Sequence, residues 1–341
     1  MICHINLAKG YRGGERQTEL LIKELSLNRF KQKIFVRKNS QLIERLKNVD
    51  NLEIIELNKP FIFNIFKFKN CKILHAHEKK AEQLAFFVNL FLKKPYFITR
   101  RVDIKPKVNF FNKLIYKRAT KVFVLSSIIN KIMKDTFEVN TQIIPSVSSS
   151  LTTTSELSSL QEQYKNNFII TNIAALVHGH KGQEYIIKAA NLLKDNKNLK
   201  FLLVGEGKDK EKYEKMIKEY NLNNVELVGF KKNVGDYLEI SDIFLFPSLN
   251  EGLGSILIDA MEFGKVIIAT NVGGIPDLIK DNYNGLLITS ADELAIKEAI
   301  EKLYKNKSLR ERLSKKAKAE SNKYQIKNLI NKYLENYKAF L

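Results

Sequence analysis

Cysteine is scarce in this chain of 341 residues, and signals for export or membrane insertion are missing. The two cysteines, Cys3 and Cys71, lie in or beside apolar runs. They imply no disulfide framework and suit a reducing compartment. The N-terminal stretch MICHINLAKGYRGG lacks the basic-then-apolar order of a signal peptide. No uninterrupted apolar run reaches the ~20 residues that cross a bilayer, so we expect a cytoplasmic protein, soluble or peripheral.

Sequence motifs for several kinds of chemistry are also absent. There is no HExxH or CxxC spacing, which argues against a zinc site. The dinucleotide fingerprint GxGxxG and the Walker A loop are missing. We find no RNP sequence or helix-turn-helix, but the net charge of +20 keeps a basic nucleic-acid-binding protein as an alternative.

This positive charge is unevenly distributed. Residues 1–150 hold 29 Lys and Arg against 12 Asp and Glu, residues 151–300 hold 16 against 21, and the last 41 residues hold 12 against 4. Such asymmetry indicates that one domain faces a polyanion or an anionic membrane. The alternative is a general abundance of lysine in the chain, which does not account for its acidic middle.

Short apolar runs alternate with helical patterns along most of the chain. This alternation predicts an α/β fold with two Rossmann-like, doubly wound parallel-sheet domains facing across a cleft. The domains are expected at 1–150 and 151–324, with a linker at 145–160 where serine and threonine dominate. A last helix, 325–341, is long enough to cross back onto the first domain.

The densest group of glycine and polar residues is SLNEGLGSILIDAMEFGKVIIATNVGGIPD, at 248–277. Glu251 follows an apolar run and lies among glycines, whereas Asp259 falls within a helical pattern. Ligands of open α/β sheets bind beyond the carboxyl ends of the strands, so the stretch predicts half of a binding site. Eight residues of helix would separate the two acids by ~12 Å. That distance suits two ends of one polyhydroxyl ligand better than a general acid and base.

Glycine and basic residues also follow other predicted strands. Gly13 and Gly14, with Arg16 nearby, form either a phosphate-binding turn or a tight bend. Lys181, in HGHKG at 178–182, precedes a helix and is a candidate diphosphate contact. The turn at 205–207 lies at the same edge of the second predicted sheet.

Histidines and arginines end two strands of the first predicted domain. His75 and His77 alternate along one strand, so they face the same side of the sheet. They are either packed side chains or catalytic ones, and His77 is the more terminal. Arg100 and Arg101 follow the next strand, where they either clamp an anion or belong to a solvated basic loop.

Taken together, these motifs resemble the retaining, nucleotide-sugar-dependent glycosyltransferases of the GT-B fold, of the family-four (glycosyl transferases group 1) type. The resemblance covers nearly the whole chain and is strongest over 174–288. The motifs that carry it, in the family's order, are GGER at 13–16, HAHE at 75–78, AALVHGHKG at 174–182, VGEG at 204–207, EGLGSILIDA at 251–260 and NVGGIPD at 271–277.

The resemblance implies a role for each of these segments. Glu251 would contact hydroxyls of the donor sugar, Asp259 the nucleotide ribose, and Lys181 the diphosphate. His77 would support the reacting sugar. The remaining donor-binding positions are Gly13, Gly14, Gly205, Glu206, Gly252, Leu253 and Gly254.

Two departures from the family pattern bear on phosphate binding. Asp259 replaces a glutamate, which shortens the reach but keeps the acceptor atoms. An arginine that many relatives carry shortly before the lysine is missing, and Arg16, Arg100 or Arg101 are the candidates to replace it. The implied mechanism retains the anomeric configuration without a protein nucleophile, with the leaving diphosphate accepting the acceptor's proton. We expect no metal and no other cofactor.

The basic first domain suggests a place for this chemistry. PFIFNIFKFK at 60–69 combines apolar residues with two lysines, and residues 93–118 add more cations around Phe110 and Phe111. These segments could hold the enzyme on an anionic inner leaflet, where the acceptor would be a glycan or lipid-linked glycan such as a lipooligosaccharide core. A solvated basic face is the alternative. A GT-B epimerase acting on a nucleotide sugar is the second enzymatic candidate.

Overall fold

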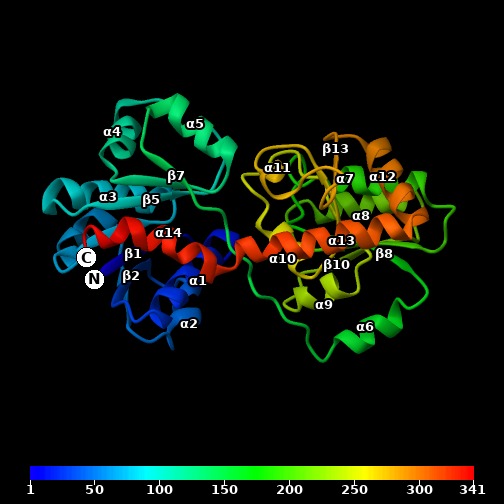
Figure 1. The fold of residues 1–341 in the computed structure, drawn as a ribbon, viewed down its shortest axis with the longest axis horizontal. Coiled ribbons are helices and arrows are strands. Elements are labelled where there is room, and N and C mark those ends of the chain that lie inside the picture. Colours follow the sequence, from blue (N-terminus) through cyan, green and yellow to red (C-terminus); the bar gives the residue numbers. More distant parts are fainter. The chain divides into compact units, whose positions relative to one another are not determined.

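The computed structural model describes residues 1–341, and the chain divides into two compact units. Unit 1 comprises Met1–Ser149 together with Tyr324–Leu341, and unit 2 comprises Ser150–Lys323. Each unit contains one parallel β-sheet with helices packed against it (Figure 1). The predicted α/β class with two doubly wound sheets is confirmed.

The sheet of unit 1 has seven strands in the order β3-β2-β1-β4-β5-β6-β7. The strands are β1 (Ile2–Asn6), β2 (Gln32–Arg37), β3 (Leu52–Leu57), β4 (Ile73–Ala76), β5 (Tyr96–Arg100), β6 (Lys121–Val124) and β7 (Thr141–Ile143). The helices are α1 (Gly13–Leu27), α2 (Gln41–Leu46), the 3-10 helix η1 (Phe61–Phe68), α3 (Lys79–Leu92), α4 (Phe110–Arg118), α5 (Ser127–Phe137) and α14 (Ile326–Lys338). The direction of strand order reverses between β1 and β4, which makes that pair the switch point of the sheet.

Helix α14 returns to unit 1 from the end of the chain, and in Figure 1 it is the red helix among blue and cyan elements. Its buried residues recur at helical spacing, so one face is apolar. That face (Ile330, Tyr333, Leu334 and Tyr337) packs in a cluster with Ile2, Ile73, Phe97 and Phe123 from the sheet. The last helix therefore completes the core of the first unit.

The sheet of unit 2 has six strands in the order β10-β9-β8-β11-β12-β13, with its switch point between β8 and β11. The strands are β8 (Phe168–Ile173), β9 (Leu199–Val204), β10 (Val225–Gly229), β11 (Ile243–Phe246), β12 (Val266–Thr270) and β13 (Leu286–Ile288). The helices are α6 (Leu157–Gln163), α7 (Gln183–Leu192), α8 (Lys210–Glu219), α9 (Val234–Glu239), α10 (Ser255–Glu262), α11 (Ile275–Leu278), α12 (Glu293–Lys305) and α13 (Lys307–Ser321), followed by the 3-10 turn η2 (Asn322–Tyr324).

Helix α6 lies partly inside the segment that the sequence predicts to be an irregular linker. Leu160 of this helix packs against a cluster that contains Tyr164, Ile169 and Tyr237. Serine and threonine around it hide this short helical pattern, because tertiary packing rather than local propensity stabilises so short a helix.

The expectation of unpaired cysteines is wrong in this structure, because Cys3 and Cys71 form a disulfide with their Cα atoms 5.8 Å apart. Cys3 lies on β1, and Cys71 precedes the neighbouring strand β4 by two residues. The 68 residues between them conceal this adjacency in the sequence. None of the helices combines the length and apolar character needed to cross a membrane.

Candidate functional site

The switch point of unit 2 brings together two charged residues that are 70 positions apart. Lys181 follows β8 and Glu251 follows β11, which are neighbouring strands. Lys181 Nζ lies 2.6 Å from Glu251 Oε2, and the two side chains are 21% and 17% exposed. This ion pair therefore lies at the carboxyl edge of the sheet, partly open to solvent, where ligands of such folds bind.

Two glycines allow helices to begin beside this ion pair. Gly182 precedes α7 with φ +74°, and a Cβ there would lie 1.9 Å from the carbonyl oxygen of Pro247. Gly254 precedes α10 with φ +82°. Only glycine adopts these conformations without strain. The N-terminal N–H groups of both helices are consequently held near the loops that carry Lys181 and Glu251.

Backbone hydrogen bonds join the three loops of this edge. Leu249 N donates to His180 O at 2.9 Å, which ties the loop after β11 to the loop after β8. Gly274 N donates to Glu251 O at 2.9 Å, which adds the second glycine turn, after β12. The positions of Lys181 and Glu251 are thus fixed by backbone contacts as well as by their ion pair.

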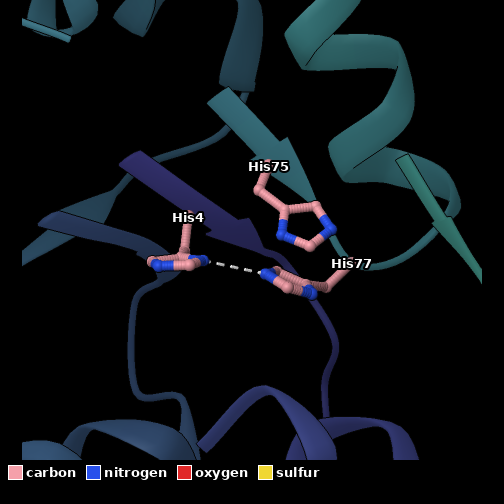
Figure 2. Close-up of side chains that lie close together, drawn as sticks. All are labelled: His4, His75 and His77. Carbon is pink, nitrogen blue, oxygen red and sulfur yellow. Dashed lines mark hydrogen bonds between the residues drawn. The ribbon is translucent and has the colours of Figure 1, made fainter. Parts of the chain in front are cut away.

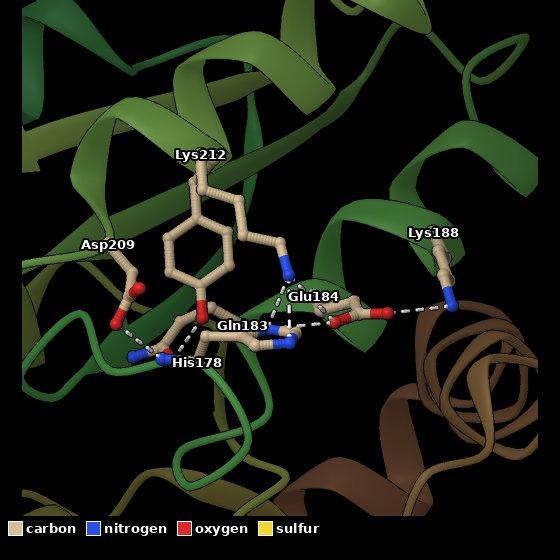
Figure 3. Close-up of polar contacts among 7 residues, drawn as sticks. His178, Gln183, Glu184, Lys188, Asp209 and Lys212 are labelled. Carbon is tan, nitrogen blue, oxygen red and sulfur yellow. Dashed lines mark hydrogen bonds and ion pairs between the residues drawn. The ribbon is translucent and has the colours of Figure 1, made fainter.

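A polar network around His178, in the loop that also contains Lys181, anchors this loop to α7 and α8 (Figure 3). His178 N donates to Asp209 Oδ2 at 3.0 Å, and His178 Nδ1 lies 3.0 Å from Glu184 Oε2. Burial opposes ionisation of Glu184, but its contacts with Lys188, His178 and Lys212 outweigh burial and lower its pKa overall. The buried amide of Gln183 donates to Ala175 O at 3.0 Å. The network holds the loop from both sides.

The other predicted donor-binding residues of unit 2 lie around the same edge. Gly205 has φ +147°, and a Cβ there would lie 2.0 Å from Ala174 O, so the loops after β8 and β9 touch through their backbones. Glu206 is exposed and pairs with Lys210 at 3.2 Å. Asp259 lies within α10 and is almost wholly buried. Gly252 and Leu253 are buried in the loop before that helix.

At the switch point of unit 1, three histidine rings lie together. His4 comes from β1, His75 from β4, and His77 from the residues just after β4 (Figure 2). His4 Nδ1 lies 3.0 Å from His77 Nε2, and the rings of His75 and His77 are 4.0 Å apart. All three are buried. The histidines are therefore packed side chains at a strand end, and a catalytic role for His77 stays a prediction.

The histidines are uncharged near neutral pH, because burial disfavours the imidazolium form. Burial lowers the pKa of His4 to about 4, against a smaller opposing effect of its hydrogen bond to Gln32. Burial, followed by the neighbouring ring of His4 and the charge of Arg101, lowers the pKa of His75 well below its usual range. The pKa of His77 is lowered in the same direction by burial, by both other histidines and by Arg101.

The structure separates the roles of the three candidate arginines. Arg16 donates to Glu19 Oε1 and to Ser149 O, both at 2.9 Å, so it pairs with a neighbouring acid. Arg100 is buried and donates to the hydroxyl of Tyr116 at 3.3 Å. Arg101 instead lies against the start of α1, where a Cβ on Gly14 would be 3.4 Å from its Cδ. Its buried Nε has no hydrogen-bond partner. Arg101 is thus the arginine brought to the Gly13-Gly14 turn.

The histidine cluster also satisfies a first requirement of a metal site. One ring nitrogen from each of His4, His75 and His77 lies within 4.8 Å of the others. However, both nitrogens of His75 already contact hydroxyls, of Thr99 and Tyr337, at 2.6 Å. The nearby charge of Arg101 would also repel a cation. Hydrogen bonding accounts for the cluster better than metal binding does.

A cavity of about 570 Å³ lies elsewhere in unit 2, lined by residues such as Asn167, Leu199, Lys200 and Asn224. These residues lie at or just before the starts of β8, β9 and β10. The cavity is therefore at the amino edge of the sheet, opposite to the edge where α/β folds bind ligands. We do not assign it to the candidate site.

Sequence reasoning did not find His4, the member of the cluster on β1, or its partner Gln32 on β2. Their partners are 73 and 28 residues away, and neither residue belongs to a recognisable motif. The continuous burial of β1 was the available signal, since a histidine inside a fully buried strand requires a partner.

Known proteins are similar to this chain in sequence and in fold. Residues 155–320 match the family model described as glycosyl transferases group 1. An uncharacterized glycosyltransferase of Methanocaldococcus jannaschii is 30% identical over 274 residues, which are 76% of this chain and 65% of that protein. A Campylobacter jejuni N,N'-diacetylbacillosaminyl-diphospho-undecaprenol alpha-1,3-N-acetylgalactosaminyltransferase is 29% identical over 158 residues, 46% of this chain and 41% of that protein. The chain thus spans less than two thirds of the length of these relatives.

Solved structures match over nearly the whole chain. Anabaena HepE in complex with UDP-glucose has a TM-score of 0.87 at 17% identity, covering 99% of both chains. A glycosyltransferase from Rickettsia africae has the same TM-score at 20% identity, covering 99% of this chain and 98% of that one. The fold is that of GT-B glycosyltransferases. Residues 155–320 are similar to the glycosyl transferases group 1 family.

Proposed function

We propose that this protein is a glycosyltransferase that moves a sugar from a nucleotide-diphosphate sugar to a glycan or lipid-linked acceptor, with retention of anomeric configuration. The observation that carries the proposal is the contact between Lys181 and Glu251 at the switch point of unit 2. In this proposal Lys181 supplies a cation for the diphosphate, and Glu251 supplies a carboxylate for hydroxyl groups of the sugar. The UDP and UDP-glucose bound to Anabaena HepE support a nucleotide sugar as the ligand of this fold.

The donor would bind along the carboxyl edge of the unit 2 sheet. Lys181 and the N-terminal N–H groups of α7 would neutralise the diphosphate, whose charge grows as the sugar leaves. Glu251 would then exchange its contact with Lys181 for hydroxyl groups of the sugar. Asp259 would accept a hydrogen bond from the ribose, and Gly205 with Glu206 would border the base. In this proposal the protein's own cations and dipoles meet the phosphate charge, without a metal or other cofactor.

Retention follows from which group accepts the proton. We propose that the leaving diphosphate, held by Lys181, takes the proton of the acceptor hydroxyl on the face from which it departs. The new bond then forms on that same face, and no protein nucleophile is used. His77 would contact a hydroxyl of the reacting sugar, and Arg101 with the Gly13-Gly14 turn would contact a donor phosphate or the acceptor.

The proposed acceptor belongs to cell-surface glycan assembly, such as a lipooligosaccharide core. The name of the Campylobacter jejuni relative describes transfer to a diphospho-undecaprenol-linked sugar, which supports a lipid-linked acceptor. Unit 1 also exposes apolar side chains on neighbouring segments: Phe63 and Phe66 of η1, Phe91 of α3, and Val108 and Phe110 at the start of α4. Exposed lysines lie near them in the sequence: Lys67, Lys69, Lys93, Lys105 and Lys107. We call these five apolar and five basic residues the aromatic-basic surface and propose that it contacts an anionic membrane on the cytoplasmic side.

The test begins with a thermal-shift screen of UDP, GDP, ADP and their sugar conjugates, because a ligand of the folded state raises the melting temperature. The stabilising donor is then incubated with glycan and lipid-linked acceptors, and the anomeric configuration of the product is determined by proton NMR. Transfer with retention supports the proposal. Inversion would refute the mechanism, and consumption of donor without any acceptor would favour the epimerase. Salt-sensitive retention on DNA with no sugar transfer would favour a nucleic-acid-binding protein.

A further inference from the structure

The two ring nitrogens of His77 have different surroundings. Nε2 lies 3.0 Å from His4 Nδ1, as the dashed line in Figure 2 shows. Nδ1 is buried and has no hydrogen-bond partner. A buried nitrogen without a partner is unfavourable in a folded protein, so this atom requires an explanation. Whether Nδ1 is a donor or an acceptor depends on which nitrogen of the neutral ring carries the proton.

The position of that proton follows from a chain of contacts that begins at a backbone carbonyl. Gln32 Nε2 lies 3.0 Å from Ile22 O, which can only accept a hydrogen bond. The amide of Gln32 is therefore oriented with its Oε1 toward His4 Nε2, also at 3.0 Å. A flipped amide would place two carbonyl oxygens against each other. Because Oε1 only accepts, His4 Nε2 must be the protonated nitrogen.

The protonation of His4 in turn determines which ring nitrogen of His77 carries the proton. His4 is uncharged near neutral pH, so its single ring proton is on Nε2 and its Nδ1 is an acceptor. His77 Nε2 must then be the donor of the bond between the two rings. His77 is uncharged as well, which leaves its Nδ1 as a buried lone pair without a partner.

We propose that Gln32 and His4 are positioning residues that hold His77 in the Nε2–H tautomer, so that its Nδ1 accepts a hydrogen bond from a substrate hydroxyl. This inference rests on the proposed function, because a sugar supplies the hydroxyl. A lone pair fixed in advance needs no reorganisation when the sugar binds, and it discriminates against a donor that lacks the hydroxyl. Ile22 O and the Gln32 amide set the direction of every hydrogen bond in this series without contacting the substrate.

The first experiment measures the tautomer without requiring activity. The chain contains five histidines, so 15N-histidine labelling of the full-length protein gives a spectrum that single substitutions can assign. His178→Gln and His180→Gln identify the two residues of unit 2. Long-range 1H–15N correlations are expected to show His4 and His77 as neutral rings protonated at Nε2. A proton on Nδ1 of His77 would overturn the proposal, whether or not the protein transfers sugar.

The second experiment interrupts this series of hydrogen bonds at a residue that does not contact the substrate. Gln32→Leu removes the acceptor of the His4 proton and is expected to produce a mixture of His77 tautomers. kcat should fall on the order of 3- to 10-fold, as expected for one hydrogen bond, with little change in the KM of the acceptor. Gln142→Leu is the matched control, because it removes a bond to Asn336 at the other end of the same sheet. A fall in kcat without a change of tautomer would mean a structural role alone and would refute the inference.

A pair of substitutions at His4 keeps the test decisive if Gln32→Leu does not fold. His4→Asn keeps an acceptor near the position of Nδ1, whereas His4→Phe keeps the ring shape without an acceptor. The phenylalanine variant is expected to lose the Nε2–H preference of His77 and to lower kcat. The asparagine variant should restore both. Equal tautomer populations and equal kcat in the two variants would contradict the proposal. If the wild type has the stated tautomer but transfers no sugar, the result would count against the glycosyltransferase function alone.

Discussion

Lys181 Nζ lies 2.6 Å from Glu251 Oε2, and this contact joins the loops after two neighbouring strands, β8 and β11. Each charged group satisfies the other before any ligand is bound. A diphosphate is a stronger partner for Lys181 than one carboxylate, because it carries more negative charge. In the proposed mechanism the ion pair keeps both side chains oriented toward the edge of the sheet until the donor replaces it.

The first prediction concerns the charge of Lys181. Lys181→Met keeps the length of the side chain and removes the cation, so transfer is expected to fall on the order of 10²- to 10³-fold, the usual cost of losing a group that stabilises transition-state charge. The midpoint of thermal unfolding should change little, because the pair is partly exposed. Lys297→Met, which removes a similar pair with Glu301 on α12, is the matched control. Steady-state kinetics and a melting curve decide between loss of function and loss of fold.

Glu251 is predicted to act through its acceptor atoms. Glu251→Ala should abolish transfer while leaving the fold intact, since the polar contact of its side chain is with Lys181, at the partly exposed edge of the sheet. Glu251→Gln keeps one acceptor oxygen and should retain partial activity. Near-normal kcat in the alanine variant would show that the donor sugar binds elsewhere. Circular dichroism provides the check on folding.

The sequence was sufficient for the parts of the site that are built locally. Glu251 is predicted to follow an apolar run, which is strand β11, and Lys181 is predicted to precede a helix, which is α7. Apolar runs followed by glycine and a helical pattern contain this information. They place Lys181 and Glu251 at strand ends, and the parallel sheet then brings those ends together.

Contacts that depend on the direction in which a side chain points could not be predicted from such local patterns. Arg16, Arg100 and Arg101 are equivalent candidates in the sequence, yet the first pairs with Glu19 and the second bonds within the fold. The disulfide between Cys3 and Cys71 depends on the pairing of β1 with β4, which no local pattern indicates. Strand order in three dimensions is required before such partners are known.

The separation of the arginines gives a third prediction. Arg101→Met is expected to lower transfer about 10-fold or more, because its guanidinium lies beside the Gly13-Gly14 turn and its Nε has no protein partner. Arg16→Met should leave transfer near the wild-type level, since Arg16 is already bonded to Glu19 and Ser149. Kinetics with varied donor concentration measure the difference. The reverse order of effects would assign the phosphate or acceptor contact to Arg16.

A fourth prediction concerns the stability of unit 1 in acid. In the unfolded chain the histidines bind protons below about pH 6.5, whereas burial holds the pKa of folded His4 at about 4. A folded-state pKa that is lowered contributes stability above the unfolded pKa, and this stability is lost as the pH falls. For His4 the loss between pH 6.5 and 4 is about 3 kcal/mol at most, and His75 and His77 act in the same direction.

Urea denaturation followed at several pH values in this range measures that loss. His4→Phe removes the titrating group while keeping a buried ring, so its stability should depend less steeply on pH than that of the wild type. A variant such as His180→Phe, in the exposed loop of unit 2, serves as the control. If wild type and His4→Phe lose stability in parallel, the buried histidine is not the cause.

The aromatic-basic surface of unit 1 is predicted to bind anionic membranes. Phe63 and Phe66 are 80% and 69% exposed, and their spacing of three residues on a 3-10 helix places them on one side of it. Burying a phenylalanine in an apolar phase is worth about 1.5–3 kcal/mol, and each nearby lysine adds about 1 kcal/mol at an anionic surface.

Flotation with anionic liposomes should therefore recover the protein, less so at high salt, and the double variant Phe63→Ser, Phe66→Ser should bind on the order of 10-fold or more weakly. Leu27→Ser is the matched control, because Leu27 is an equally exposed apolar residue (78%) at the end of α1, outside this surface. Equal flotation with neutral and anionic lipid, or equal loss in the control, would identify the surface as a solvated basic face.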